Sequence, residues 1–125
     1  MLEDSPAFSG FSVTDLDAAR AFYGDALGLT VEDGGPGFRL KLAGGTDVLV
    51  YPSPSHQPSS YTVLNFPVPR IEPVVDELAA RGVVFETYAG TPMSTDEKGV
   101  FRRGGPLIAW FKNPAGNTLS VIEAP

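Results

Sequence analysis

Phe11-Ser12-Val13-Thr14-Asp15-Leu16 reappears further along the chain as Phe66-Pro67-Val68-Pro69-Arg70-Ile71. In both places a short apolar strand runs into a helix whose apolar residues lie three or four positions apart. A short chain that repeats itself is typical of two copies of one supersecondary unit, neither of which can bury its apolar face alone. The repeat therefore predicts a binding site in a cleft between the two copies.

The composition indicates a single globular domain of 125 residues, of which 42% are hydrophobic. A net charge of −6 argues against a nucleic-acid partner, because phosphate contacts need a basic surface. The acidity either attracts a cationic ligand or only keeps the protein soluble. The chain has no cysteine, no apolar run near the ~20 residues of a membrane span, and an acidic start unlike a signal peptide. We expect a cytoplasmic protein without a membrane partner.

The first copy, residues 6–53, is expected to be a βαβββ module. Asp15, or Thr14 in a variant of the capping box, is expected to cap a helix of about ten residues that ends at Gly28. The buried stripe of this helix would be Leu16, Ala19, Tyr23 and Leu27. Strands are expected over residues 8–13, 29–32, 38–42 and 47–51, with glycine-rich turns between them.

The second copy, residues 61–125, follows a Pro/Ser-rich connector over residues 52–60. It is expected to contain a strand over 61–68, a helix from Ile71 to Gly82, a strand over 83–88, and a final hairpin of 107–112 and 118–123. In the hairpin, Thr118-Leu119-Ser120 aligns with Val48-Leu49-Val50 of the first copy.

Residues 89–105 are an insertion that the first copy lacks. Loops this long in a compact domain are often functional, so the insertion is either a lid over a ligand or a mobile, solvated loop. The candidate lid residues are Asp96, Lys98 and Arg102.

Two motifs resemble the vicinal oxygen chelate superfamily, which includes glyoxalase I, extradiol dioxygenases, and fosfomycin- and bleomycin-resistance proteins. One is Phe11-x-Val13-x-Asp15-Leu16 continuing to Phe22-Tyr23 and Leu27-Gly28-Leu29, and the other is Asn113-Pro114-Ala115-Gly116-Asn117-Thr118-Leu119. The resemblance covers nearly the whole chain. It implies an α+β fold in which two βαβββ modules form a curved eight-stranded mixed sheet around a cleft, and it implies a homodimer.

Enzymes of this superfamily hold a divalent metal in the cleft with His, Glu or Gln side chains. Counted from the motifs, the four ligand positions fall on Phe8, Val50, Val63 and Ser120. The first three carry no donor atom and serine is a poor ligand. Shifting the count by one residue, to Ser9 or Thr62, gives no ligand set either. We therefore expect no metal and no other cofactor.

Side chains alternate between the two faces of a strand, so residues that share parity with Ser120 should line the cleft. By the same rule, Glu123 should point away from the cleft, and Asp47 should lie on the face of its strand opposite to that of Val50. The expected cleft residues are Phe8, Gly10, Ser12, Val48, Val50, Val63, Asn65, Ile108, Trp110, Thr118 and Ser120. This set is apolar and aromatic with few polar groups, as small-molecule sites are. Trp110 and Phe8 are candidates for stacking on a planar ligand. The alternative for Trp110 is that it fills the core. Asn65 is expected to make a structural hydrogen bond to a neighbouring strand.

Three functions fit the sequence. The first is a metal-free protein that binds a small aromatic or hydrophobic molecule, in the manner of bleomycin-resistance proteins. The second is a metal-independent enzyme, a lyase or isomerase, with a loop residue or the single histidine, His56, as acid or base. His56 is otherwise a surface residue of the connector. The third is a structural or regulatory protein whose cleft is packed shut.

Overall fold

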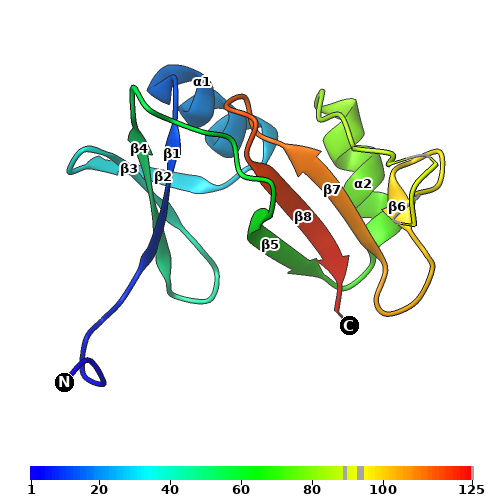
Figure 1. The fold of residues 1–125 in the computed structure, drawn as a ribbon, viewed down its shortest axis with the longest axis horizontal. Helices are drawn as coiled ribbons and strands as arrows, with labels where there is room; N and C mark the ends of the chain where they lie inside the picture. The colour runs from blue at the N-terminus through cyan, green and yellow to red at the C-terminus, as the bar shows by residue number, and fades with distance from the viewer. Residues whose placement is uncertain (89, 93–94, 125) are drawn as a thin grey trace. The chain divides into compact units, whose positions relative to one another are not determined.

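A computed structural model describes residues 1–88, 90–92 and 95–124 (Figure 1). The chain forms two compact units, Met1–Gln57 and Pro58–Pro125, and the break between them falls inside the predicted connector. Each unit contains one four-stranded mixed sheet, which confirms the α+β class. That the two modules make a single domain stays a prediction.

Unit 1 is built as the repeat predicts. Its elements are β1 (Ser9–Val13), α1 (Leu16–Ala21), the π-helical segment η1 (Phe22–Ala26), β2 (Thr30–Gly34), β3 (Gly37–Lys41) and β4 (Asp47–Pro52). The strand order is β1-β4-β3-β2, with β1 parallel to β4 and the other pairs antiparallel.

The helix of unit 1 begins and ends where the sequence predicts. The Asp15 carboxylate accepts hydrogen bonds from the backbone N–H groups of Asp17 and Ala18, so Asp15 is the N-cap. Gly28, at φ 73°, follows the end of the helical segment. Tyr23 is fully buried and its ring contacts those of Phe11 and Phe38 on the sheet.

Unit 2 repeats the plan with a smaller edge strand. Its elements are β5 (Thr62–Val68), α2 (Ile71–Ala80), β6 (Val100–Phe101), β7 (Ile108–Lys112) and β8 (Thr118–Glu123), in the sheet order β5-β8-β7-β6. Figure 1 shows α2 against one face of this sheet, where Ile71 and Val75 are buried. Arg70 provides no side-chain cap for α2, and the Glu123 carboxylate accepts from the Ile71 N–H instead.

The predicted strand over 83–88 is wrong. This segment contributes only a bridge between Phe85 and Phe111 and a hydrogen bond from Glu86 N–H to the Trp110 carbonyl. The edge strand is β6 instead, which pairs with Ala109 and Ile108. It lies within the segment predicted as an insertion, and residues 89, 93 and 94 of that segment lie outside the described residues. Residues 83–88 and β6 both pair with the same edge of β7, so neither of them pairs along the whole length of β7.

The strand registers correct the predicted face of β4. Phe11 pairs with Val50 in unit 1, and its repeat partner Phe66 pairs with Val121 in unit 2. Val50 therefore corresponds to Val121, and the counterpart of Ser120 is Leu49. A slip of one residue moves a side chain to the other face. Placing Val48 and Val50 with Ser12 is accordingly wrong.

The two valines instead share the face of Phe11 and Val13, in the buried core beneath α1. Leu49, Tyr51 and Asp47 take the opposite face. We call the sheet face opposite the helix the open face of each unit.

A bulge corrects the position of Val63. Thr62 pairs with Thr118 and Leu64 pairs with Leu119, so the register skips Val63. A bulge leaves its extra residue out of the ladder and breaks the alternation. Thr62, not Val63, is therefore the residue beside Thr118.

Gly99→Ala is expected to destabilise unit 2 more than Gly82→Ala does. Both glycines have a similar positive φ, 91° and 94°, so alanine costs about 1–2 kcal/mol at either position. A Cβ at Gly99 would lie 2.6 Å from the Phe85 Cβ, whereas a Cβ at Gly82 meets nothing within 4 Å. Denaturant titration should show a further loss of about 1–3 kcal/mol for Gly99→Ala. Equal losses would contradict the close packing of this segment.

Candidate functional site

The open face of unit 2 gathers five of the eleven predicted cleft residues. Trp110 on β7 pairs with Ser120 on β8, which pairs with Asn65 on β5, so the three form one row across the sheet. Paired residues point to the same face. Ile108 and Thr118 occupy neighbouring positions of the same parity on β7 and β8.

Asn65 and Ser120 bond to each other. The Ser120 hydroxyl is fully buried and donates to the Asn65 side-chain oxygen at 2.6 Å. This is the hydrogen bond to a neighbouring strand that was predicted for Asn65. This bond satisfies the buried hydroxyl and ties β5 to β8 on the open face.

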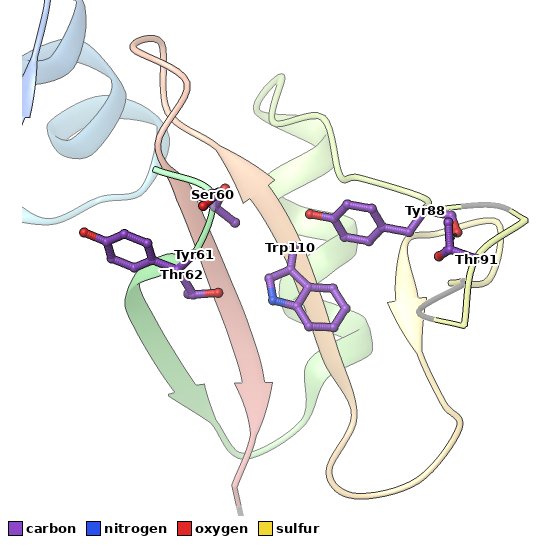
Figure 2. Close-up of a pocket in the computed structure, with 7 residues that line it drawn as sticks. Ser60, Tyr61, Thr62, Tyr88, Thr91 and Trp110 are labelled. Atoms are coloured by element: carbon purple, nitrogen blue, oxygen red, sulfur yellow. Dashed lines mark hydrogen bonds between the residues drawn. The ribbon is translucent and has the colours of Figure 1, made fainter. Parts of the chain in front are cut away.

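A pocket of about 320 Å³ opens on this face at Trp110. Its lining residues are Ser60, Tyr61, Thr62, Tyr88, Thr91, Trp110 and Thr118. Figure 2 shows the indole of Trp110 between Thr62 and Tyr88, with its nitrogen on the edge toward Thr62. None of these seven residues is charged, so the described lining is a neutral aromatic surface with hydroxyl groups around it.

Aromatic contacts position Trp110. Its ring centroid lies 5.6 Å from that of Tyr88, at an interplanar angle of 69°, and 6.0 Å from that of Phe101. The contact with Tyr88 is edge-to-face and the contact with Phe101 is tilted, and together they hold the indole in place. Trp110 is half-buried, which leaves part of the ring available in the pocket.

Tyr88 has a strained backbone at the pocket wall. Its φ is 48°, a left-handed conformation that bulky residues rarely adopt. The Tyr88 carbonyl accepts from the Thr91 N–H at 3.3 Å and from the Thr91 hydroxyl at 2.8 Å, which holds the turn. Burial raises the pKa of the Tyr88 hydroxyl, with a further contribution from Glu86, so the phenol stays protonated and can donate a hydrogen bond.

The sequence did not predict five of the lining residues, which are Ser60, Tyr61, Thr62, Tyr88 and Thr91. The expected strand over 83–88 would have made Tyr88 an ordinary strand residue, and nothing in its neighbours indicates a left-handed turn. Thr62 was hidden by the bulge, because the alternation counted back from Asn65 leads to Val63.

His56 meets Ser12 on the open face of unit 1. The Ser12 hydroxyl lies 2.6 Å from His56 Nδ1, and both side chains are half-buried. Two backbone hydrogen bonds bring the connector to this point: Ser53 N–H donates to the Val13 carbonyl, and His56 N–H donates to the Ser53 carbonyl. His56 is therefore not an isolated surface residue.

Phe8 lies on the same face of unit 1, outside the Trp110 pocket. It is 56% exposed, and the guanidinium of Arg39 lies 4.7 Å from its ring centroid. The cation–π contact with Arg39 occupies one face of the Phe8 ring.

None of the three candidate lid residues is among the described lining residues of the Trp110 pocket: Lys98 and Arg102 are bound to α2, and Asp96 is bound to Arg102. Arg102 pairs with Asp96 and with Glu72 of α2, and Lys98 pairs with Asp76 of α2. The Asp96 carboxylate also accepts from the N–H groups of Lys98 and Val100. Burial raises the pKa of Asp96, but these hydrogen bonds, led by that from Arg102, outweigh it and lower the pKa below its ordinary value. These bonds fold the segment onto the helix.

The residues at the expected metal positions do not fit a divalent ion. With the corrected register the positions are Phe8, Leu49, Thr62 or Val63, and Ser120, and the Ser120 hydroxyl already bonds to Asn65. Across residues 1–88, 90–92 and 95–124, no three His, Cys, Asp or Glu side chains come close enough to hold a metal. Zinc and the other catalytic metals need several such ligands.

A family profile described as Glyoxalase/Bleomycin resistance protein/Dioxygenase superfamily matches residues 8–121. The chain belongs to this superfamily. The resemblance inferred from the two motifs is thereby confirmed. A comparison with curated proteins finds no match. No helix within the described ranges is long and apolar enough to cross a bilayer.

Solved structures share the fold at low sequence identity. FosX, a genomically encoded fosfomycin resistance protein from Listeria monocytogenes, has a TM-score of 0.72 at 13% identity, covering 95% of this chain and 92% of its own. TnmS3, an antibiotic binding protein from Streptomyces sp. CB03234, has a TM-score of 0.62 at 23% identity, covering 95% and 96%. A glyoxalase family protein from Enterococcus faecalis has a TM-score of 0.67 at 23% identity, covering 98% and 100%.

Protein purified without chelator from medium supplemented with zinc, manganese and nickel is expected to carry far less than one metal ion per chain. We expect this low metal content because the four positions do not supply a set of metal ligands. Elemental analysis of the protein after dialysis measures it. One ion per chain that is lost in Ser120→Ala but kept in the surface variant Val84→Ser would contradict this account of the four positions.

Proposed function

We propose that this protein binds a small, uncharged, largely apolar molecule with a planar aromatic part and does not need a metal to do so. The observation that carries the proposal is the neutral aromatic pocket on the open face of unit 2, with Trp110 at its centre. Small-molecule sites have this composition: apolar and aromatic walls with a few polar groups that fix orientation.

The pocket offers two kinds of interaction to such a ligand. Stacking on the indole contributes about 1 kcal/mol beyond the burial of apolar area. The Trp110 N–H and the protonated Tyr88 hydroxyl can donate to a carbonyl or ether oxygen at the ligand's edge. Binding therefore favours a flat molecule that carries hydrogen-bond acceptors over one that carries charge.

The backbone strain at Tyr88 supports a binding role. Strained conformations cost of order 1–3 kcal/mol and cluster at ligand-binding and active sites. The fold neighbours support it as well, since one is an antibiotic binding protein and another a fosfomycin resistance protein. The volume of the pocket favours binding over a structural protein whose cleft is packed shut.

We extend the proposal to a cytoplasmic homodimer, as the composition and the family resemblance imply. The alternative is a metal-independent lyase or isomerase that uses a loop residue or His56 as acid or base. The His56 side chain lies in unit 1, hydrogen-bonded to Ser12, and not in the Trp110 pocket.

Trp110 is the only tryptophan, so its fluorescence reports directly on the proposed site. Titration with coumarin or naphthalene is expected to quench or shift this emission in a saturable way and to raise the melting temperature with ligand concentration. Naphthalene sulfonate, which adds a charge to the same ring, is expected to bind more weakly.

Variants separate the pocket from the rest of the surface. Trp110→Leu, followed by calorimetry, and Tyr88→Gly, followed by fluorescence, are expected to weaken binding at least about tenfold, or ~1.4 kcal/mol. Glycine keeps the left-handed backbone at position 88 and removes only the ring. Val84→Ser, at a site 81% exposed, is the control and should leave affinity unchanged. Equal affinity for all four proteins would refute the proposed site.

A further inference from the structure

We infer that Ser12 and His56 form a nucleophile–base pair, and that unit 1 therefore cleaves small esters with good leaving groups. The decisive observation is the 2.6 Å separation of the Ser12 hydroxyl from His56 Nδ1. A serine hydroxyl is a weak nucleophile until an adjacent base takes its proton. His56 is the chain's only histidine, and there is no cysteine, so the one imidazole base of the protein faces a hydroxyl.

Two rigid segments bring the pair together from distant parts of the sequence. Ser12 is on β1, between Phe11 and Val13, whose side chains are buried on the other face of the sheet. The backbone hydrogen bonds from Ser53 to Val13 and from His56 to Ser53 fix the connector above the end of β1. A nucleophile held by a strand and a base held by a tied turn meet the geometric requirement for proton transfer.

The surroundings of Ser12 fit an aryl ester. Tyr51 is its neighbour in the register, and Gly10 precedes it on the same face without a side chain. Phe8 lies further along this face. The Tyr51 side chain beside the hydroxyl can contact the acyl or aryl part of a small substrate.

The reaction follows from the pair alone and water. The Ser12 oxygen bonds to the carbonyl carbon of the ester while its proton passes to His56 Nδ1, with the other ring nitrogen protonated in this tautomer. The carbon–oxygen bond to the leaving group then breaks, and the leaving oxygen takes the proton from His56. Water repeats the sequence on the acyl-serine and releases the acid. The sum is ester plus water giving acid plus alcohol.

The test uses the full chain and p-nitrophenyl acetate. Released p-nitrophenolate is followed by absorbance, and the acylated residue is identified by mass spectrometry of the intact and digested protein. We expect one acetyl group per chain, on Ser12, with an initial burst of p-nitrophenolate. Ser12→Ala should abolish the burst. His56→Gln keeps a hydrogen-bond acceptor but no base, and should slow acylation about 10²-fold or more.

Two further variants keep the test decisive. Ser55→Ala, at a connector serine bonded to Ser53, is the matched control and should acylate at the wild-type rate. Ser12→Cys introduces the chain's only thiol beside the same base and should acylate at least as fast as wild type. Thermal melts confirm that each variant is folded. An absent adduct in the wild type, or the same rate in Ser12→Ala or His56→Gln, would overturn the inference, independently of ligand binding at Trp110.

Discussion

The pairing of the first and last strand of each unit fixes which side chains face the helix and which face away from it. In unit 1, Phe11 lies beside Val50, and in unit 2, Phe66 lies beside Val121. These apolar residues join the core beneath the helix. Because side chains alternate along a strand, the same registers leave Ser12 with Tyr51, and Asn65 with Ser120, on the open faces.

The two open faces have different chemistry although the units share one plan. At the Trp110 pocket the lining of the unit 2 face is uncharged and aromatic. The unit 1 face carries the Lys41–Asp47 ion pair, Arg39 over Phe8, and the Ser12–His56 hydrogen bond. A neutral aromatic surface suits reversible binding, whereas a paired hydroxyl and imidazole suit proton transfer. The repeat has thus kept its core and diverged on the exposed sides.

Most of the fold could be predicted from the sequence, since Asp15, Gly28 and Gly82 carry clear helix start and stop signals. Which side chains of β4 face the helix could not be predicted. The strand contains the hydrophobic run Val48, Leu49, Val50 and Tyr51, which gives no polar–apolar alternation from which to read the register. In β8 the polar Thr118 and Ser120 alternate with Leu119 and Val121, and there the prediction was correct. The bulge at Val63, the left-handed Tyr88 and the short β6 depend on long-range pairing, which local sequence patterns do not encode.

We propose that the aromatic ligand binds on the open face of unit 2 and not on the helix side of that unit. A second cavity of about 300 Å³ lies on the helix side of the same unit, lined by residues that include Val75, Val83 and Phe85. A ¹H–¹⁵N correlation spectrum of the labelled protein during a coumarin titration distinguishes the two. We predict saturable shifts of the Trp110 indole N–H and of the Thr62, Tyr88 and Thr118 amides. Shifts confined to Val75, Val83 and Phe85, with an unchanged indole signal, would contradict the account.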